Sequence, residues 1–204
     1  MVVSAKGTRL NKRGIETRRQ VIDAAIDTLA AARGGDPVSA NLVARHAGVT
    51  WGTMQHQFGD VDGLWAAVLD HIVDVWQPAP DSLDATMSAP ERIEIMVERF
   101  WRALAAREGR AVENLRHMLP GDPSVLESSY PATAAAMAAW EQRWAAAYAR
   151  FFDGLDVDTT KSQRVQSFLP GALRGLWSES NLSTYIDVEE GRRGLVEAIV
   201  AYLC

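Results

Sequence analysis

The chain has 204 residues, of which 48% are hydrophobic and 23% charged, and its net charge is −5. These values are typical of a globular protein, and no apolar run approaches the ~20 residues that would span a bilayer. The only cysteine is Cys204, which excludes an internal disulfide framework. The basic start also lacks the apolar segment of a secretory signal, so we expect a cytoplasmic protein.

Charge is distributed unevenly along the chain. Residues 1–58 carry eight Lys and Arg against four Asp and Glu, whereas residues 59–204 carry thirteen against twenty-two. Within the first 20 residues, six basic residues accompany one acidic residue, Glu16. This basic arm is either a solvated, frayed terminus or a segment attracted to phosphates. The acidic remainder would discourage nucleic acid from binding elsewhere on the molecule.

Helical periodicity runs through most of the chain, without a convincing alternating strand pattern. In the first helix, Thr17 and Gln20 have the spacing of a capping box that marks its start, although the helix is free to begin earlier. Glycine and proline at residues 34–37 end this helix. Its apolar stripe comprises Ile22, Ala25, Ile26 and Leu29.

Two short helices follow, joined by a tight turn. Ser39 is positioned to cap a helix over residues 40–47, Gly48 breaks it, and Thr50 is positioned to cap another helix over residues 51–57. Asp60 is positioned to cap a longer fourth helix that reaches Trp76. Two short helices joined by a glycine turn form the helix-turn-helix pattern, whose second helix enters the major groove of DNA.

The second short helix has an apolar side and a polar side. At 100° per residue Phe58 falls close to Met54, so this side faces inward, while Gly52 and His56 point nearly opposite. Thr53 and Gln55 lie on the flanks. Gln can pair with adenine, Thr can meet a phosphate or a thymine methyl, and a phosphate is favoured at the helix N-terminus. The alternative is an exposed polar helix without a partner.

The remaining segments also predict helices. A loop rich in Pro and Ser over residues 77–90 precedes a helix that Gly109 stops, and a shorter helix over residues 111–119 stops at the turn of residues 120–123. A long helix is expected over about residues 132–152, followed by helices over residues 160–179 and 188–203. The fold class is therefore all-α.

The acidic half carries two further features. Large, adaptable side chains suit a pocket for a flat or apolar ligand, although each of them could equally belong to a packed core. The last two helices carry wide apolar faces, and Gly171 and Gly175 allow a close helix approach, which suits either an intrachain core or a two-fold dimer interface. The candidate ligand-binding residues are Phe100, Trp101, Met118, Met137, Trp140, Trp144 and Trp177.

Residues 15–70 resemble the N-terminal domain of the TetR (tetracycline-repressor-like) family. The shared motifs are Thr17-Arg18 and Ile22-x-x-Ala25 in the first helix, Val43-Ala44-x-x-Ala47-Gly48-Val49-Thr50 across the turn, and Gly52-Thr53-Met54 with Phe58 and Leu64 beyond it. The rest of the chain matches the family only in its length and helical character.

The resemblance implies a homodimeric transcriptional regulator, most often a repressor that a small molecule releases from DNA. It implies that dimerisation uses the two C-terminal helices, and that Thr50, Trp51, Thr53, Gln55 and His56 face DNA, with Arg18 and Ser39 near phosphates. The chain departs from the family pattern at Gln55, where Tyr is usual, and at Val61, where Lys is usual. Without these phosphate contacts, and with Asp60 and Asp62 nearby, we expect a weaker clamp on the DNA backbone.

No catalytic, metal or cofactor motif stands out in the sequence. The four histidines lack metal-ligand spacing, and there is no nucleophile elbow, Walker or dinucleotide fingerprint. We therefore expect a DNA-binding domain over residues 1–62 and a ligand-binding and dimerisation domain over residues 63–204, without a cofactor and without enzymatic activity. The expected partners are a palindromic DNA operator, a small apolar or aromatic effector and a second copy, and the expected effect is repression. The alternative is a helical adaptor for protein interactions that has lost DNA binding.

Overall fold

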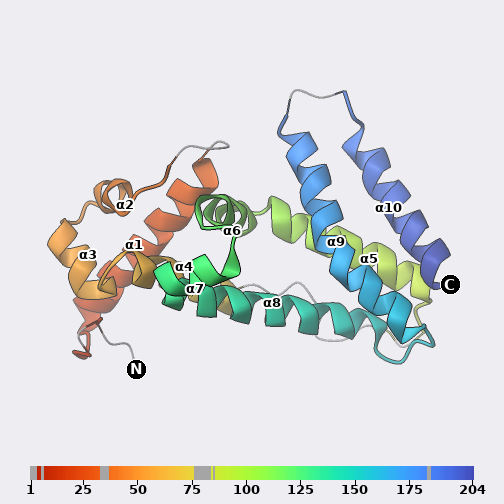
Figure 1. The fold of residues 1–204 in the computed structure, drawn as a ribbon, viewed down its shortest axis with the longest axis horizontal. Coiled ribbons are helices and arrows are strands. Elements are labelled where there is room, and N and C mark those ends of the chain that lie inside the picture. Colours follow the sequence, from red (N-terminus) through yellow and green to blue (C-terminus); the bar gives the residue numbers. More distant parts are fainter. Residues whose placement is uncertain (1–3, 6, 33–36, 76–83, 85, 183–184) are drawn as a thin grey trace. The chain divides into compact units, whose positions relative to one another are not determined.

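A computed structural model of the chain describes residues 4–5, 7–32, 37–75, 84, 86–182 and 185–204. These residues form ten α-helices (Figure 1). The chain divides into two compact units, one formed by residues 1–76 and 107–141 and the other by residues 77–106 and 142–204. The expected boundary at residues 62 and 63 falls inside the first unit. It stays a prediction, because it concerns which residues bind DNA and ligand.

The first unit contains six complete helices and the start of a seventh. Its apolar side chains form one buried cluster, with Ile26, Leu29, Val43, Leu64 and Ile72 among its fully buried members. The apolar stripe that the sequence predicted on the first helix lies in this cluster. The helices are α1 (Lys12–Ala31), α2 (Ala40–His46), α3 (Trp51–Phe58), α4 (Val61–Val75), α6 (Arg107–Met118), α7 (Pro123–Ser129) and the first part of α8 (Pro131–Phe152).

Helix α1 begins earlier than its capping-box motif indicated. Asn11 is the N-cap, and its side-chain oxygen accepts a hydrogen bond from the Gly14 amide at 2.8 Å. Thr17 lies in the second turn, where its hydroxyl donates to the carbonyl of Arg13 instead of capping the helix. The Asn cap was overlooked because Thr17 and Gln20 gave a stronger local pattern.

Two expectations for the middle of the chain are wrong. Gly109 does not stop a helix, because the break lies at Ala106, whose backbone is extended, and Gly109 is buried inside α6. The turn after α6 also starts the unexpected helix α7. There the Asp122 carboxylate accepts hydrogen bonds from the amides of Ser124 and Val125, and Pro123 occupies the first helical position. An Asp cap followed by Pro is a start signal as well as a turn signal.

The second unit contains α5 (Ala89–Ala105), the end of α8, α9 (Thr159–Ser180) and α10 (Val188–Leu203). Its core is aromatic. The ring centroid of Phe100 lies 3.9 Å from that of Trp144 and 5.7 Å from that of Phe151. Cys204, a free and exposed thiol, follows the last residue of α10.

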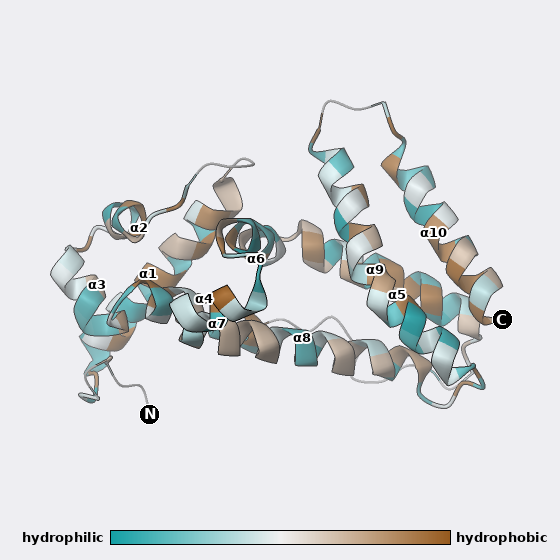
Figure 2. Ribbon diagram, viewed as in Figure 1, coloured by the Kyte–Doolittle hydropathy of each residue, from teal (hydrophilic) through white to brown (hydrophobic). Residues whose placement is uncertain are grey.

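The all-α fold class is confirmed. Figure 2 shows apolar and polar residues on different sides of the helices, as expected for helices that each bury one face. Among the described residues, none of the helices combines the length and the apolar character that crossing a bilayer requires.

Candidate nucleic-acid interface and ligand region

The turn between α2 and α3 is built from two caps and one glycine. The hydroxyl of Ser39 accepts the Leu42 amide at 3.2 Å, and the hydroxyl of Thr50 accepts the Thr53 amide at 3.2 Å. Gly48 has a φ of 65°, a left-handed backbone conformation that residues other than glycine adopt only at a cost in free energy. Both caps are therefore engaged at the helix N-termini, as the sequence predicted.

The inward face of α3 is fixed by packing and by one polar contact. Met54 is 2% exposed and Phe58 is also buried. Gln57, between them on this face, is buried as well, and its side-chain nitrogen donates to the carbonyl of Gly14 on α1 at 3.1 Å. This contact joins α1 to the last turn of α3.

Arg18 strengthens the same connection. Its guanidinium donates to the carbonyl of Gln57 at 2.6 Å and lies 4.4 Å from the ring centroid of Phe58. Partial burial lowers the pKa of Arg18, an effect that the nearby charge of Asp70 opposes. Arg18, expected near a phosphate, thus has an intramolecular role in holding α3, which the sequence analysis missed.

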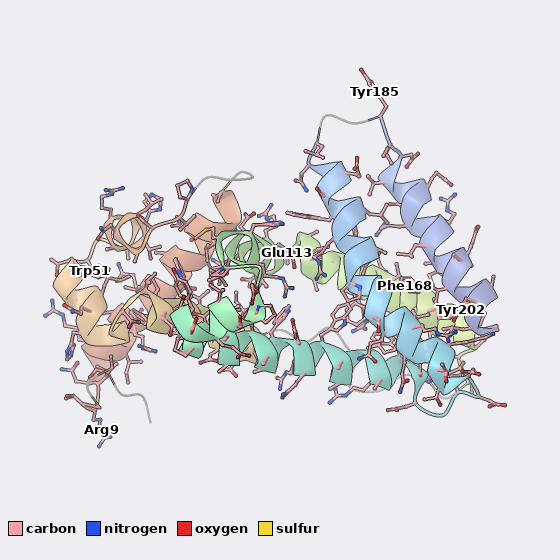
Figure 3. All side chains as sticks on the ribbon, viewed as in Figure 1. Arg9, Trp51, Glu113, Phe168, Tyr185 and Tyr202 are labelled. Atoms are coloured by element: carbon pink, nitrogen blue, oxygen red, sulfur yellow. The ribbon has the colours of Figure 1, made fainter. Side chains whose placement is uncertain are left out.

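The outward face of α3 presents the side chains that the helical wheel placed there. Trp51 is 45% exposed at the start of the helix (Figure 3), and Gln55 and His56 are exposed further along it. Thr53 is half-buried, with its hydroxyl 3.0 Å from that of Thr50. A Cβ added at Gly52 would meet nothing closer than the Thr50 hydroxyl oxygen, at 3.8 Å. The absence of a side chain at Gly52 therefore lets a binding partner approach the backbone of α3 closely on this face.

The turn from α3 to α4 brings the backbones of the two helices into contact. Gly59 has a φ of 86°, and the Asp60 carboxylate caps α4 by accepting the Gly63 amide at 2.9 Å. A Cβ added at Gly63 would lie only 2.1 Å from the carbonyl oxygen of Phe58, so the two helices meet backbone to backbone.

The carboxylate of Asp62 is also engaged within the protein. It accepts the amides of Ala132 at 2.9 Å and Thr133 at 2.8 Å, at the start of α8. The sequence analysis expected Asp60 to cap α4, which is confirmed, and it treated Asp60 and Asp62 together as charges that would repel DNA, which stays a prediction. The structure shows that both serve as helix caps.

The basic arm is folded at the residues that the structure describes. The Ser4 amide donates to the carbonyl of Thr8 at 2.9 Å, and the Thr8 amide donates to the Ser4 hydroxyl at 3.2 Å. Leu10 is buried, whereas Arg9 and Lys12 are exposed and line an open groove of about 550 Å³. The described part of the arm therefore forms a local turn at Ser4–Thr8, and the exposed basic residues Arg9 and Lys12 follow this turn.

The predicted ligand-binding residues fall in both units. Met118, Met137 and Trp140 belong to the first unit, where Met137 is buried and Trp140 packs against the apolar cluster. Phe100, Trp101, Trp144 and Trp177 belong to the second. The rings of Phe100 and Trp144 contact each other in a tilted arrangement within the aromatic core described above. The assignment of these seven residues to one ligand site stays a prediction.

Trp101 contacts Arg192, one of the residues that line a charged groove in the second unit. The guanidinium of Arg192 on α10 lies 5.0 Å from its ring centroid and donates to the carboxylates of Glu98, at 2.6 Å, and Glu189. The groove, of about 550 Å³, lies between α5 and α10 and is lined by charges of both signs. This groove suits a polar contact between helices better than an apolar ligand.

Gln57, Asp62 and Gly63 have structural roles that the sequence analysis did not predict. The partners of Gln57 and Asp62 lie 43 and 71 positions away in the chain, so no local pattern identifies them. The close approach at Gly63 had a weak signal, because glycine is unfavourable in the first turn of a helix unless a backbone contact requires it.

The arrangement of a helix-turn-helix before a helical bundle is shared with solved structures. No family model matches the sequence, and no curated protein matches it. A transcriptional regulator from Rhodococcus sp. Rha1 is 16% identical, with a TM-score of 0.66 over 91% of this chain and 97% of that one. The multidrug binding protein EbrR, complexed with imidazole, is 21% identical, with a TM-score of 0.55 over 99% and 98%. The chain therefore has the TetR-like fold that its sequence motifs implied.

Proposed function

We propose that the protein is a ligand-responsive, DNA-binding transcriptional regulator that acts as a homodimeric repressor on a palindromic operator. The observation that carries this proposal is the outward face of α3. Its polar and aromatic side chains, Trp51, Gln55 and His56, are exposed, while Met54, Gln57 and Phe58 hold the helix from behind. A rigidly held helix with free polar groups suits the reading of base edges in the major groove.

The surroundings of α3 support backbone contacts. The N-termini of α2 and α3, capped by Ser39 and Thr50, carry the partial positive charge that favours a phosphate. Arg9, Lys12 and Arg13 are exposed at the start of the chain. Because Arg18 is already bound to Gln57 and Phe58, we assign it the support of α3 and give the phosphate contacts to these more exposed residues.

The exposed face of α9 and α10 supports the dimer. Phe168 is 44% exposed, and a Cβ added at Gly171 or Gly175, on the same side of α9, would meet no described atom within 4 Å. On α10, Ala198 and Ala201 are also exposed. Small residues around a large apolar one allow helices of two copies to pack closely, and two-fold symmetry would then place the reading helices about 34–36 Å apart.

The effector would bind in the α-helical region outside the helix-turn-helix. The similarity in fold to a multidrug binding protein and the aromatic character of the second unit favour a small apolar or aromatic ligand. The predicted ligand-binding residues, above all Phe100, Trp101, Trp144 and Trp177, remain the candidates. By favouring one dimer geometry over another, such a ligand would change the affinity for DNA by its differential affinity for the two states.

A salt series on duplex DNA tests the proposal. A regulator of this kind should bind DNA with an affinity that falls steeply as salt rises, because each phosphate contact releases counterions. Footprinting on the DNA that flanks its own gene should then show a protected site with two-fold symmetry. A chain that acts as a protein adaptor would show neither the salt-dependent affinity nor the footprint.

A further inference from the structure

We propose that Asp62 is a positioning residue that fastens the N-terminus of α8 to the DNA-reading helix α3. A displacement of α8 would then be transmitted to α3 through the carboxylate of Asp62. The inference rests on the proposed function, because that function assigns the reading of DNA to α3.

The contact is a helix cap supplied from a different helix. One oxygen of Asp62 accepts the Ala132 amide at 2.9 Å, and the other accepts the Thr133 amide at 2.8 Å and the Thr133 hydroxyl at 2.7 Å. The first amides of a helix have no partner within the helix, and a carboxylate there is also favoured by the helix dipole. Tyr130, which precedes the helix, is not among the residue types that usually cap it. Asp62 therefore replaces the missing local cap.

The contact is half-buried on the side of Asp62 and buried on the side of Thr133. Thr133 is fully buried, at 0% exposed, and its hydroxyl also lies 3.2 Å from the backbone carbonyl oxygen of Asp62. Loss of the carboxylate would leave the buried hydroxyl and the amide donors without their strongest acceptor. Unsatisfied buried donors are costly, so α8 should shift or fray at this end when the contact is broken.

Helix α3 is tightly connected to the same turn. Only Gly59 and Asp60 separate the end of α3 from the start of α4, and Asp60 caps α4 through the Gly63 amide. The backbone of Gly63 touches the Phe58 carbonyl so closely that it leaves no space for a side chain. Asp62 therefore lies beside a backbone contact between α3 and α4, and its displacement would be transmitted to the last turn of α3.

Helix α8 is suited to carry a signal into this contact. It begins in the first unit, and its residues 142–152 belong to the second unit, where Trp144 and Phe151 pack against Phe100. Helix α6 also contacts the DNA-binding region, but its Asn114 donates to the carbonyls of Leu29 and Ala32, at the end of α1 remote from Arg18. The contact through Asp62 is the more direct connection to α3.

Hydrogen exchange on the complete protein, with and without DNA, tests the inference. Asp62→Ala removes the cap, Thr133→Val removes only its hydroxyl donor, and Asp62→Asn keeps one acceptor oxygen. We expect Asp62→Ala to speed exchange of the amides of residues 54–58 and of the first turn of α8 about five- to tenfold, Thr133→Val to do so less, and Asp62→Asn least. The amides of α2 should keep their wild-type rates, whereas general destabilisation would speed them too.

A matched control separates this role from ordinary capping. Asp122 caps α7 with the same chemistry, because its carboxylate accepts the amide and the hydroxyl of Ser124 and the amide of Val125. These partners lie only two and three positions further along the chain. Asp122→Ala should affect α7 and leave α3 unchanged. Affinity for the footprinted DNA fragment should fall about five- to tenfold in Asp62→Ala and stay within twofold of wild type in Asp122→Ala.

The outcomes distinguish the two proposals. Faster exchange confined to the first turn of α8, or spread equally over α2 and α3, overturns the positioning role of Asp62. A wild-type protein without salt-dependent DNA binding overturns the proposed function, while the exchange data still decide whether α8 and α3 are coupled. Selective exchange in α3 together with weaker DNA binding supports both.

Discussion

Helix α3 and the pair α9 and α10 both expose side chains, but of opposite kinds. On α3 the exposed residues are polar or amphipathic, such as Gln55 and His56, and the apolar ones are buried. On α9 and after it, large apolar side chains are exposed, with Phe168 at 44% and Tyr185 at 106% (Figure 3). The first face is suited to a hydrated, charged partner and the second to an apolar one.

The two faces also differ in how they are held. Three connections fix α3 from behind, namely Gln57 to α1, Arg18 to the end of α3, and Gly63 against Phe58. On α9, by contrast, Gly171 and Gly175 face open space in the described structure. A helix that reads a sequence needs a fixed position before it binds, whereas a helix at a dimer interface gains its neighbours from the second copy.

The largest effect should come from the backbone contact behind α3. Gly63→Ala would place a Cβ 2.1 Å from the Phe58 carbonyl oxygen, which only a movement of the backbone can relieve. We expect the free energy of unfolding to fall by about 3–4 kcal/mol. Urea denaturation measures it. The control is Gly52→Ala on the outward face, where a Cβ has space and stability should stay the same or rise by up to about 1 kcal/mol.

The next effect concerns the apolar face. Phe168→Glu would place a charge at the centre of the proposed interface, so the dimer should dissociate about a hundredfold more readily, equivalent to about 3 kcal/mol. Analytical ultracentrifugation over a range of concentrations measures it. Val125→Glu is the control, because Val125 on α7 is 45% exposed but lies in the other unit. If both variants dimerise like the wild type, the interface lies elsewhere.

A smaller effect should separate the two sides of α3. Gln55→Ala should relax the preference for one base pair by about 1–3 kcal/mol, without loss of thermal stability. Competition binding with operators altered at single positions measures this preference. Gln57→Ala should do the reverse, lowering stability through loss of the bond to Gly14 while keeping the base preference. An unchanged preference in Gln55→Ala contradicts our assignment of the reading face.

The smallest effect concerns a charge behind α3. Desolvation raises the pKa of Asp70, as does the charge of Asp74, against the opposing effect of Arg18. A raised carboxyl pKa favours the folded state at low pH, and this contribution is lost as pH rises through the folded-state pKa. Asp70→Asn should therefore stabilise the protein at pH 7 by only about a few tenths of a kcal/mol, since solvent screens this exposed group. Its advantage over wild type should shrink toward pH 4 in thermal denaturation.

The sequence was sufficient to predict what local patterns determine. The stripe through Ile22 and Leu29, the caps Ser39 and Thr50, and the orientation of Met54 all depend on neighbours within a few positions, and the structure agrees with them. The all-α fold also follows from periodicity. Helix α7 was missed because the Asp-Pro signal at its start was interpreted only as a stop for the preceding helix.

Long-range contacts were beyond the reach of such patterns. The resemblance to the TetR family implied that Arg18 lies near a phosphate, and this stays a prediction. The intramolecular contacts of its guanidinium with the Gln57 carbonyl and the Phe58 ring could not be read from the sequence.

Asp62 was interpreted as a repulsive charge because it flanks Val61, where the family usually has a phosphate-binding Lys. Its partner Thr133 lies 71 positions away, so no local pattern indicated the contact. The sequence shows which residues are charged and on which helix they lie. Which group each charged side chain contacts depends on the tertiary fold.

The exposed thiol of Cys204, directly after α10, has a practical consequence. It is the only cysteine in the chain, so a spin label attached there modifies each copy once, without engineered substitutions. In a two-fold dimer, pulsed electron paramagnetic resonance would then record a single label-to-label separation. Titrating candidate effectors while following that separation would screen for compounds that rearrange the C-terminal helices, before any operator is identified.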